Sequence, residues 1–258
     1  MPVTSARDVA TQMASSASGG APTPEKEAHS AFSEDLAGYV GGRVGILGGM
    51  FNPPHLGHRA LARAAASELE LDVVLLTPVL ISPHKPVKWD PGAEHRLRMC
   101  RIAVHEDDRL GVCTLELERA GPSYTVDTLT SIHAIRPDAE LTLILGADIA
   151  RTLGSWREPT KILELARLAV AEREGTTRAE IIDALVPLGG EDRIVFLRMA
   201  PHDVSSSLVR RSLSTGAPIE QLVGADVAGY IAQHELYGRQ PTGRAQGPAL
   251  EDREGSAL

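Results

Sequence analysis

The sequence predicts an α/β fold, a Rossmann-like parallel sheet flanked by helices in a single domain. Two observations support this prediction: short continuous apolar runs recur along the chain, and helical patterns lie between them. Continuous apolar runs are typical of strands buried on both faces, and strands that alternate with helices favour parallel pairing through right-handed crossovers. The runs are residues 43–47, 73–77, 141–145, 168–171 and 194–197. Such a sheet binds ligands beyond the carboxyl ends of its strands.

The helices between these strands have recognisable beginnings. A capping residue or an early proline marks each one, since both suit the unpaired amides of a first helical turn. The predicted starts are Asp90-Pro91, Thr125, Glu158-Pro159 and Ser205, and a further helical pattern covers residues 59–69. Leu115 to Glu118 alternates apolar and acidic residues, which predicts an exposed or edge strand.

Composition divides the 258 residues into three parts. Residues 1–39 are rich in Ala, Ser, Thr, Gly and Pro, so this segment cannot bury enough apolar surface to offset its ordering entropy. Residues 239–258 are similarly polar. We therefore expect a disordered leader, one folded domain over 40–238 and a flexible tail.

Charge and composition exclude several classes of protein. No run approaches the ~20 apolar residues of a membrane helix, and no secretory signal begins the chain, so we expect a cytoplasmic protein without a membrane partner. The net charge of -8 argues against a nucleic-acid partner. Cys100 and Cys113 fit no disulfide or zinc pattern, which predicts two buried thiols. Whether copies of the chain form a homo-oligomer stays open.

The segment 48–58, directly after the first predicted strand, has the composition of a phosphate-binding turn. It reads Gly-Gly-Met-Phe-Asn-Pro-Pro-His-Leu-Gly-His. Gly48 and Gly49 lack a Cβ, so the backbone can bend sharply there and a phosphate can approach its amides, while the N-terminus of the following helix adds partial positive charge. The spacing matches neither the dinucleotide fingerprint nor the Walker loop, so other groups must hold the anion.

His55 and His58 are the candidates for holding it. They lie three residues apart at the entrance of a helix, where both imidazoles can face one oligophosphate, and a bound phosphate would raise the pKa of each. Two isolated histidines at this spacing also fit a metal pair or two surface side chains. No third metal ligand stands at a suitable position, and the pattern Gly-Gly-x-Phe-x-Pro-x-His-x-Gly-His favours phosphate binding.

This segment resembles the signature of the nucleotidyltransferase superfamily that is marked by a His-x-Gly-His motif. Further segments resemble one of its members, the bacterial nicotinate-nucleotide adenylyltransferase family, in the expected order. They are Pro83-His84-Lys85, residues 94–99, Ser123-Tyr124-Thr125 with its continuation to Leu129, Gly146-Ala147-Asp148, Ser155-Trp156-Arg157, residues 203–210 and residues 227–237. The histidine motif alone indicates the superfamily, whereas the segments around Tyr124 and Trp156 indicate a pyridine nucleotide.

The resemblance implies that the 5′-phosphate of nicotinate mononucleotide attacks the α-phosphorus of ATP, which carries Mg²⁺, to give deamido-NAD and pyrophosphate. A phosphate monoester has its second pKa near ~6, so this nucleophile is mostly dianionic at neutral pH and needs no protein base. Catalysis then consists of aligning two anions and stabilising the charge that develops on the phosphoryl oxygens.

The resemblance also implies roles for individual residues around ATP. His58 would contact the α-phosphate in the transition state, and His55 the remaining phosphates. Ser206, Ser207 and Arg210 would form a second clamp on the outer phosphates. The other ATP-binding residues would be Gly48, Gly49, Gly146 and Asp148, with the Asp148 carboxylate accepting from ribose hydroxyls. An ordinary helix cap is the alternative for Asp148 and for Ser205.

On the acceptor side, the resemblance implies that Lys85 neutralises the mononucleotide phosphate, although an exposed lysine fits the same sequence. Trp156 would stack on the pyridine, with Tyr124 and Thr125 lining the same pocket, and a core tryptophan is the alternative. Backbone amides at the helix start near Thr125 would hold the nicotinate carboxylate.

Three positions depart from the family pattern: Met50 where Ser or Thr is common, Asn52 where Asp is common, and Ser212 where Arg is frequent. The two phosphate-binding histidines and the Ser/Arg clamp are intact. Two other functions remain open. One is the same transfer to nicotinamide mononucleotide or phosphopantetheine, and the other is nucleotide binding without catalysis.

Overall fold

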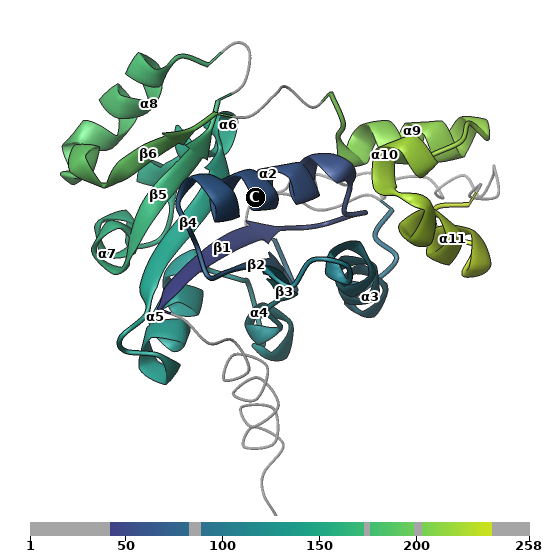
Figure 1. Ribbon diagram of the computed structural model, residues 1–258, viewed down its shortest axis with the longest axis horizontal. Helices are drawn as coiled ribbons and strands as arrows, with labels where there is room; N and C mark the ends of the chain where they lie inside the picture. The colour runs from purple at the N-terminus through teal and green to yellow at the C-terminus, as the bar shows by residue number, and fades with distance from the viewer. Residues whose placement is uncertain (1–41, 83–88, 173–175, 199–202, 239–258) are drawn as a thin grey trace, which may run out of the picture.

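A computed structural model describes residues 42–82, 89–172, 176–198 and 203–238 (Figure 1). At its centre is a six-stranded sheet with the order β3-β2-β1-β4-β5-β6, in which every neighbouring pair is parallel. The strands are β1 (Arg43–Gly49), β2 (Val73–Pro78), β3 (Leu110–Val112), β4 (Glu140–Gly146), β5 (Ala166–Ala171) and β6 (Ile194–Leu197). The order reverses between β1 and β4, which makes this point the ligand crevice of such sheets. The predicted Rossmann-like sheet is confirmed.

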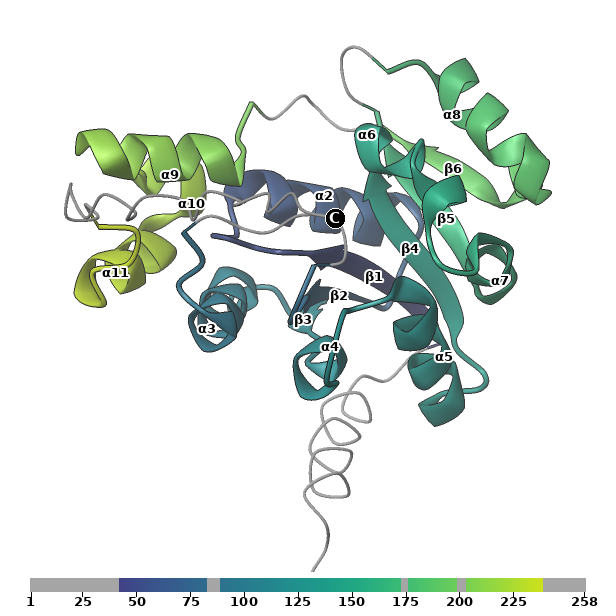
Figure 2. The same ribbon diagram turned by 180° about the vertical axis from the view of Figure 1, so that it is seen from behind.

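Helices cover both faces of the sheet. They are α2 (Leu56–Glu68), α3 (Ala93–Val104), α4 (Leu115–Glu118), α5 (Thr125–Ile135), α6 (Ala147–Ala150), α7 (Pro159–Leu165), α8 (Arg178–Leu185), α9 (Ser206–Thr215), α10 (Glu220–Val223) and α11 (Ala225–Gln233), with 3-10 turns η1 (Leu153–Ser155), η2 (Val186–Leu188) and η3 (Glu191–Arg193). Helix α2 crosses in front of β1 in Figure 1 and lies behind the sheet in Figure 2. In both views α9, α10 and α11 gather beside α3 at one end, and α8 lies with β6 at the other. No helix within these ranges has the length and apolar character needed to cross a membrane.

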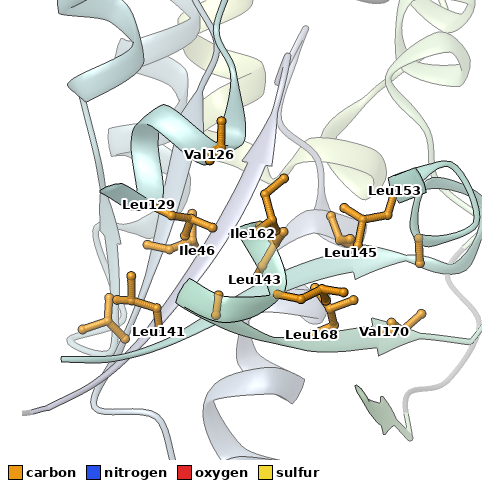
Figure 3. Close-up of a cluster of buried hydrophobic side chains, with 14 of the residues drawn as sticks. Ile46, Val126, Leu129, Leu141, Leu143, Leu145, Leu153, Ile162, Leu168 and Val170 are labelled. Carbon is orange, nitrogen blue, oxygen red and sulfur yellow. The ribbon is translucent and has the colours of Figure 1, made fainter. Parts of the chain in front are cut away.

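Two hydrophobic clusters explain why the strands read as continuous apolar runs. Ile46 and Leu143 belong to the cluster on one face, where they meet Leu129 of α5 and Ile162 of α7 (Figure 3). Their neighbours in the sequence, Leu47 and Ile144, belong to the cluster that includes the buried alanines of α2. Successive strand residues point to opposite faces, so both must be apolar when both faces are covered.

A third cluster attaches the C-terminal helices to the sheet domain. Met99 and Ala103 of α3 pack with Val209 of α9, Val223 of α10 and Ile231 of α11. This packing carries the N-terminus of α9 back to the turn after β1, where Ser206 meets Pro53 across 153 residues of sequence.

Two of the four predicted helix starts are confirmed. Glu158 precedes Pro159 at the start of α7, and the Ser205 hydroxyl accepts a hydrogen bond from the Leu208 amide at 3.1 Å as the cap of α9. The prediction at Thr125 is off by one residue, because Tyr124 occupies the cap position of α5.

The predicted cap at Asp90 is wrong. Helix α3 begins at Ala93, after Gly92 with φ of 103°. The Asp90 carboxylate instead accepts from the Gly92 amide at 2.9 Å and from Arg96 Nε at 3.0 Å. The carboxylate therefore holds the loop before the helix and a buried guanidinium.

The predicted strand at residues 115–118 is also wrong, because these residues form the single helical turn α4. Leu117 and Glu118 donate their amides to the Thr114 carbonyl, and the Thr114 hydroxyl donates to Glu118 Oε1 at 2.6 Å. Four alternating residues are too few to distinguish a strand from a helical turn.

Strand β3 was not predicted, because its three residues are too short a pattern. Both cysteines are buried free thiols, as predicted.

Candidate active site

The turn after β1 bends at a different residue from the one predicted. Gly48 and Gly49 are part of β1 and pair with Thr77 and Pro78 of β2. The backbone turns at Phe51, whose φ of 48° is left-handed, before the cis peptide bond between Asn52 and Pro53. A Cβ added at Gly48 would meet no atom within 4 Å. The bare backbone of Gly48 thus faces open space that a phosphate can enter.

His55 and His58 are locked together at the start of α2. The His58 amide donates to the His55 carbonyl at 2.9 Å, and the His55 amide donates to His58 Nδ1 at 3.2 Å. The two rings stack with centroids 3.7 Å apart, and Phe51 meets the His58 ring edge-on at 4.9 Å. A neutral imidazole that accepts at Nδ1 carries its proton on Nε2, so Nε2–H is the donor that His58 offers to a ligand.

The surroundings of the His58 ring favour its neutral form. Desolvation by the surrounding protein atoms, followed by the nearby His55 ring, lowers the pKa of His58 well below 6.5. The expectation that a phosphate raises this pKa therefore concerns the bound state only, and Arg210 is a charged donor at this corner of the free protein.

Gly57, between the two histidines, leaves space for the His55 imidazole. A Cβ at this position would lie 3.0 Å from His55 Nδ1, 3.2 Å from His55 Cε1 and 3.6 Å from the Val204 carbonyl oxygen. Gly57 belongs to the His-x-Gly-His motif, but the motif by itself does not indicate what this glycine does. Its role becomes visible only when the imidazole and the approach to α9 are placed around it.

The predicted clamp of α9 meets the histidine turn. The Ser206 hydroxyl donates to the Pro53 carbonyl at 2.8 Å. Arg210 donates from one terminal nitrogen to the Asn52 carbonyl and from the other to the Ser207 hydroxyl at 3.2 Å. The structure therefore brings Ser206, Ser207 and Arg210 to the turn that carries His55 and His58. Ser205 is an ordinary helix cap, as the alternative interpretation of the sequence had it, because its hydroxyl accepts from the Leu208 amide.

Asn52 connects this corner to two further segments, around Trp89 and Tyr237, that no sequence pattern links to it. Its side-chain oxygen accepts from the Tyr237 hydroxyl at 2.7 Å, and its Nδ2 donates to the Trp89 carbonyl at 3.3 Å. Burial raises the pKa of Tyr237, so its hydroxyl remains a donor. The amide in place of the more common carboxylate supplies the donor to Trp89 that an ionised aspartate would lack.

Gly146 and Asp148 lie at the carboxyl end of β4, the strand next to β1. A Cβ at Gly146 would meet no atom within 4 Å. Asp148 is exposed, and its Oδ1 accepts from the Thr176 hydroxyl at 3.2 Å. Both residues thus stand beside the switch point with surface available to a ligand.

Tyr124 and Thr125 stand at the start of α5, and Trp156 directly follows η1. Tyr124 and Trp156 are partly buried and pack against the same hydrophobic cluster. The Arg157 guanidinium lies 4.8 Å from the centre of the Tyr124 ring, and Trp156 Nε1 donates to the Thr152 hydroxyl at 3.1 Å.

Lys85 lies outside the described residues. A groove of about 850 Å³ between α3 and α11 contains none of these predicted site residues.

The fold and this corner define a class of protein: an α/β nucleotide-binding protein whose sheet switch point carries two imidazoles and a helix N-terminus suited to phosphates. A family model described as cytidylyltransferase-like matches residues 46–212, which is more than half of the chain.

Curated relatives narrow the class. A protein of Bordetella petrii named probable nicotinate-nucleotide adenylyltransferase is 41% identical over 196 residues, which span 76% of this chain and 98% of the relative. A protein of Dehalococcoides mccartyi (strain CBDB1) with the same name is 37% identical over 201 residues, which span 77% and 98%. The chain belongs to the nicotinate-nucleotide adenylyltransferase family of cytidylyltransferase-like proteins, as the motifs predicted.

Solved structures agree on the fold. The Plasmodium falciparum nicotinic acid mononucleotide adenylyltransferase complexed with NaAD superimposes with a TM-score of 0.63 at 18% identity, covering 76% of this chain and 98% of that one. The same enzyme complexed with APC gives a TM-score of 0.64 at 17% identity, with the same coverage.

Proposed function

We propose that this chain transfers the adenylyl group of ATP to nicotinate mononucleotide and forms deamido-NAD and pyrophosphate, in NAD biosynthesis. The observation that carries the proposal is the imidazole pair at the carboxyl end of β1, with His58 Nε2–H as donor and the clamp of α9 beside it. The names of the relatives support the choice of reaction. We place the reaction in the cytoplasm.

In this reaction an oxygen of the acceptor's 5′-phosphate forms a bond to the α-phosphorus of ATP. The bond from that phosphorus to the oxygen bridging to the β-phosphate breaks, and its electron pair leaves with pyrophosphate. The acceptor phosphate is already a dianion at neutral pH, so no side chain has to remove a proton. The residues of the chain have to orient the two anions and stabilise the developing charge.

The arrangement of the corner suits these tasks. His58 donates to an oxygen of the α-phosphate, and His55 to the adjacent phosphates. Ser207, Arg210 and the free amides at the start of the ten-residue helix α9 bind the outer phosphates. An approaching phosphate raises the pKa of His58, since negative charge favours the imidazolium, and the His58 donor strengthens where negative charge builds up.

We propose that Mg²⁺ enters bound to the phosphates of ATP and is part of that substrate. Within the described residues, no three His, Cys, Asp or Glu side chains gather as a metal site. Mg²⁺ commonly keeps several waters and is held largely by substrate phosphates, which suits this set of donors. In this proposal Gly146 and Asp148, at the carboxyl end of β4, contact the ribose of ATP.

For the acceptor, Trp156 and Tyr124 supply aromatic surface for the pyridine, and amides near Thr125 at the start of α5 suit the nicotinate carboxylate. The expected role of Lys85 toward the mononucleotide phosphate belongs to the same proposal.

The test is pyrophosphate release from ATP with nicotinate mononucleotide and nicotinamide mononucleotide as competing acceptors. We expect the acid form to give the higher kcat/KM. A higher kcat/KM for the amide form would show that nicotinamide mononucleotide is the acceptor. If neither acceptor gives pyrophosphate release while nucleotide still binds, the protein is a nucleotide-binding module without catalysis.

His58→Ala tests the role of the imidazole. We expect kcat to fall by about 10²–10³-fold, since the lost donor acts mainly in the transition state, while the Kd of an ATP analogue changes by less than about fivefold. The matched control is His133→Ala, which removes an exposed imidazole on α5. A near-normal kcat in His58→Ala would remove this residue from the mechanism.

A further inference from the structure

We propose that Arg96 is a positioning residue that holds the ATP-binding turn and the acceptor-side loop at a set separation. The proposal rests on the proposed function. Neither the motifs nor the comparisons assign Arg96 a role, although it stands within a segment that resembles the family.

Arg96 is one of the largest fully buried side chains of the protein, with 1% of its surface exposed. Burying a guanidinium destabilises the fold unless its N–H groups have hydrogen-bond partners, so the partners of Arg96 indicate its role. Because it is buried, Arg96 acts through the segments that it binds.

The partners of Arg96 come from three separate segments at the carboxyl edge of the sheet. Its Nη1 donates to the Met50 carbonyl at 3.1 Å and to the Val79 carbonyl at 2.8 Å. Its Nη2 donates to the Leu80 carbonyl at 3.4 Å, and its Nε to Asp90 Oδ1 at 3.0 Å. Met50 belongs to the turn after β1, Val79 and Leu80 to the loop after β2, and Asp90 to the approach to α3.

The loop after β2 in turn contacts the predicted pyridine pocket. The Leu80 amide donates to the Ser123 hydroxyl at 3.1 Å, and the Ser123 amide donates to the Ile81 carbonyl at 3.0 Å. Ser123 directly precedes Tyr124 and Thr125. The loop is also tied to β1, because the Val79 amide donates to the Gly49 carbonyl at 3.1 Å.

Arg96 thus connects the histidine turn on one side with the wall of the acceptor site on the other. An in-line attack depends on the distance between the two bound phosphates, and a misplacement of ~1 Å costs on the order of 100-fold in rate. A planar guanidinium can hold several carbonyls in fixed directions at once, whereas an ammonium cannot reproduce that geometry.

The experiment compares Arg96→Lys with the wild type and with Arg101→Lys, an exposed arginine on the same helix. For each protein kcat, both KM values and Tm are measured. In Arg96→Lys we expect the KM for nicotinate mononucleotide to rise at least about tenfold and kcat to fall less, because saturating acceptor draws the loop back into place. Arg101→Lys should match the wild type.

A lowered Tm with both KM values and kcat unchanged would show that Arg96 only supports the fold, and would overturn the proposal. If Arg96→Lys fails to fold, Asp90→Asn decides, since it leaves the guanidinium in place and removes the charge of its carboxylate partner while keeping an oxygen for the Gly92 amide. A raised acceptor KM in Asp90→Asn supports the proposal, and an unchanged one overturns it. Absence of turnover in the wild type would instead contradict the proposed function.

Discussion

At the scale of single residues, Gly57 controls the site through the side chain next to it. Replacing it with alanine would place a Cβ 3.0 Å from His55 Nδ1, so the stacked imidazole has to shift by a few tenths of an ångström. We expect Gly57→Ala to lower kcat by about tenfold or more, since donor placement within about an ångström determines the rate.

The matched control is Gly229→Ala in α11, where a Cβ would meet no atom within 4 Å. Because alanine favours a helix over glycine by about 1 kcal/mol, this variant should keep its activity and gain slightly in stability. Equal kinetics in the two variants would show that the His55 ring has room to adjust.

Glu116 links pH to the stability of the acceptor side. It is 5% exposed, and Thr128 donates to its Oε1 at 2.8 Å. Burial is the largest influence and raises the pKa of Glu116, although hydrogen bonds from Thr128 and Ser123 and the nearby Arg119 oppose it. Folding therefore favours the protonated acid, and the penalty for ionising it appears as the pH rises above 4.5 through the folded-state pKa.

We predict that Glu116→Gln removes this penalty. The free energy of unfolding of the variant minus that of the wild type should increase from pH 4.5 to pH 8, as measured by urea denaturation. Glu94→Gln, at an exposed position on α3, is the control. A difference that is constant or decreases with pH would contradict the raised pKa.

At the scale of elements, the start of α9 affects both the stability of the protein and the proposed binding of phosphate. The Ser205 hydroxyl caps the helix that carries Ser206, Ser207 and Arg210. We predict that Ser205→Ala costs about 1 kcal/mol of unfolding free energy, which corresponds to roughly 2–4 °C in Tm for a domain of this size.

The same variant should raise the KM for ATP, because the frayed first turn presents its amides and the clamp less well. Ser214→Ala, near the other end of α9, is the control, since its hydroxyl only donates back to the Arg211 carbonyl. An equal fall in Tm in both variants would show that the Ser205 cap stabilises the protein no more than the Ser214 hydroxyl does.

The elements also show where sequence patterns succeed. Strands β1, β2, β4 and β5 were predictable because both of their faces are covered, which requires apolar residues in succession. The turn at 115–118 was not predictable, because burial does not follow its alternating sequence: the neighbours Leu115 and Glu116 are both buried on a helical turn. The start of α3 was misplaced because Asp90 serves Arg96, a partner that no local pattern reveals.

At the scale of the whole molecule, we predict that deletion of residues 1–38 leaves kcat and both KM values unchanged, because the composition of this segment cannot support a packed core. The contrasting variant lacks residues 1–48 and so loses most of β1, the strand that pairs with both β2 and β4. It should be recovered only as aggregate. Reduced activity of the shorter deletion would give the leader a function.

The sequence by itself determined the parallel sheet, the histidine turn and the family, because these depend on local composition and on residues that are neighbours in the chain. Only the tertiary structure decided how the site is assembled. Arg96 contacts the site through the carbonyls of Met50 and Val79. Tyr237 contacts it through the side-chain amide of Asn52. Buried polar groups need partners wherever the chain places them, and the choice among those partners depends on the packing of the whole fold.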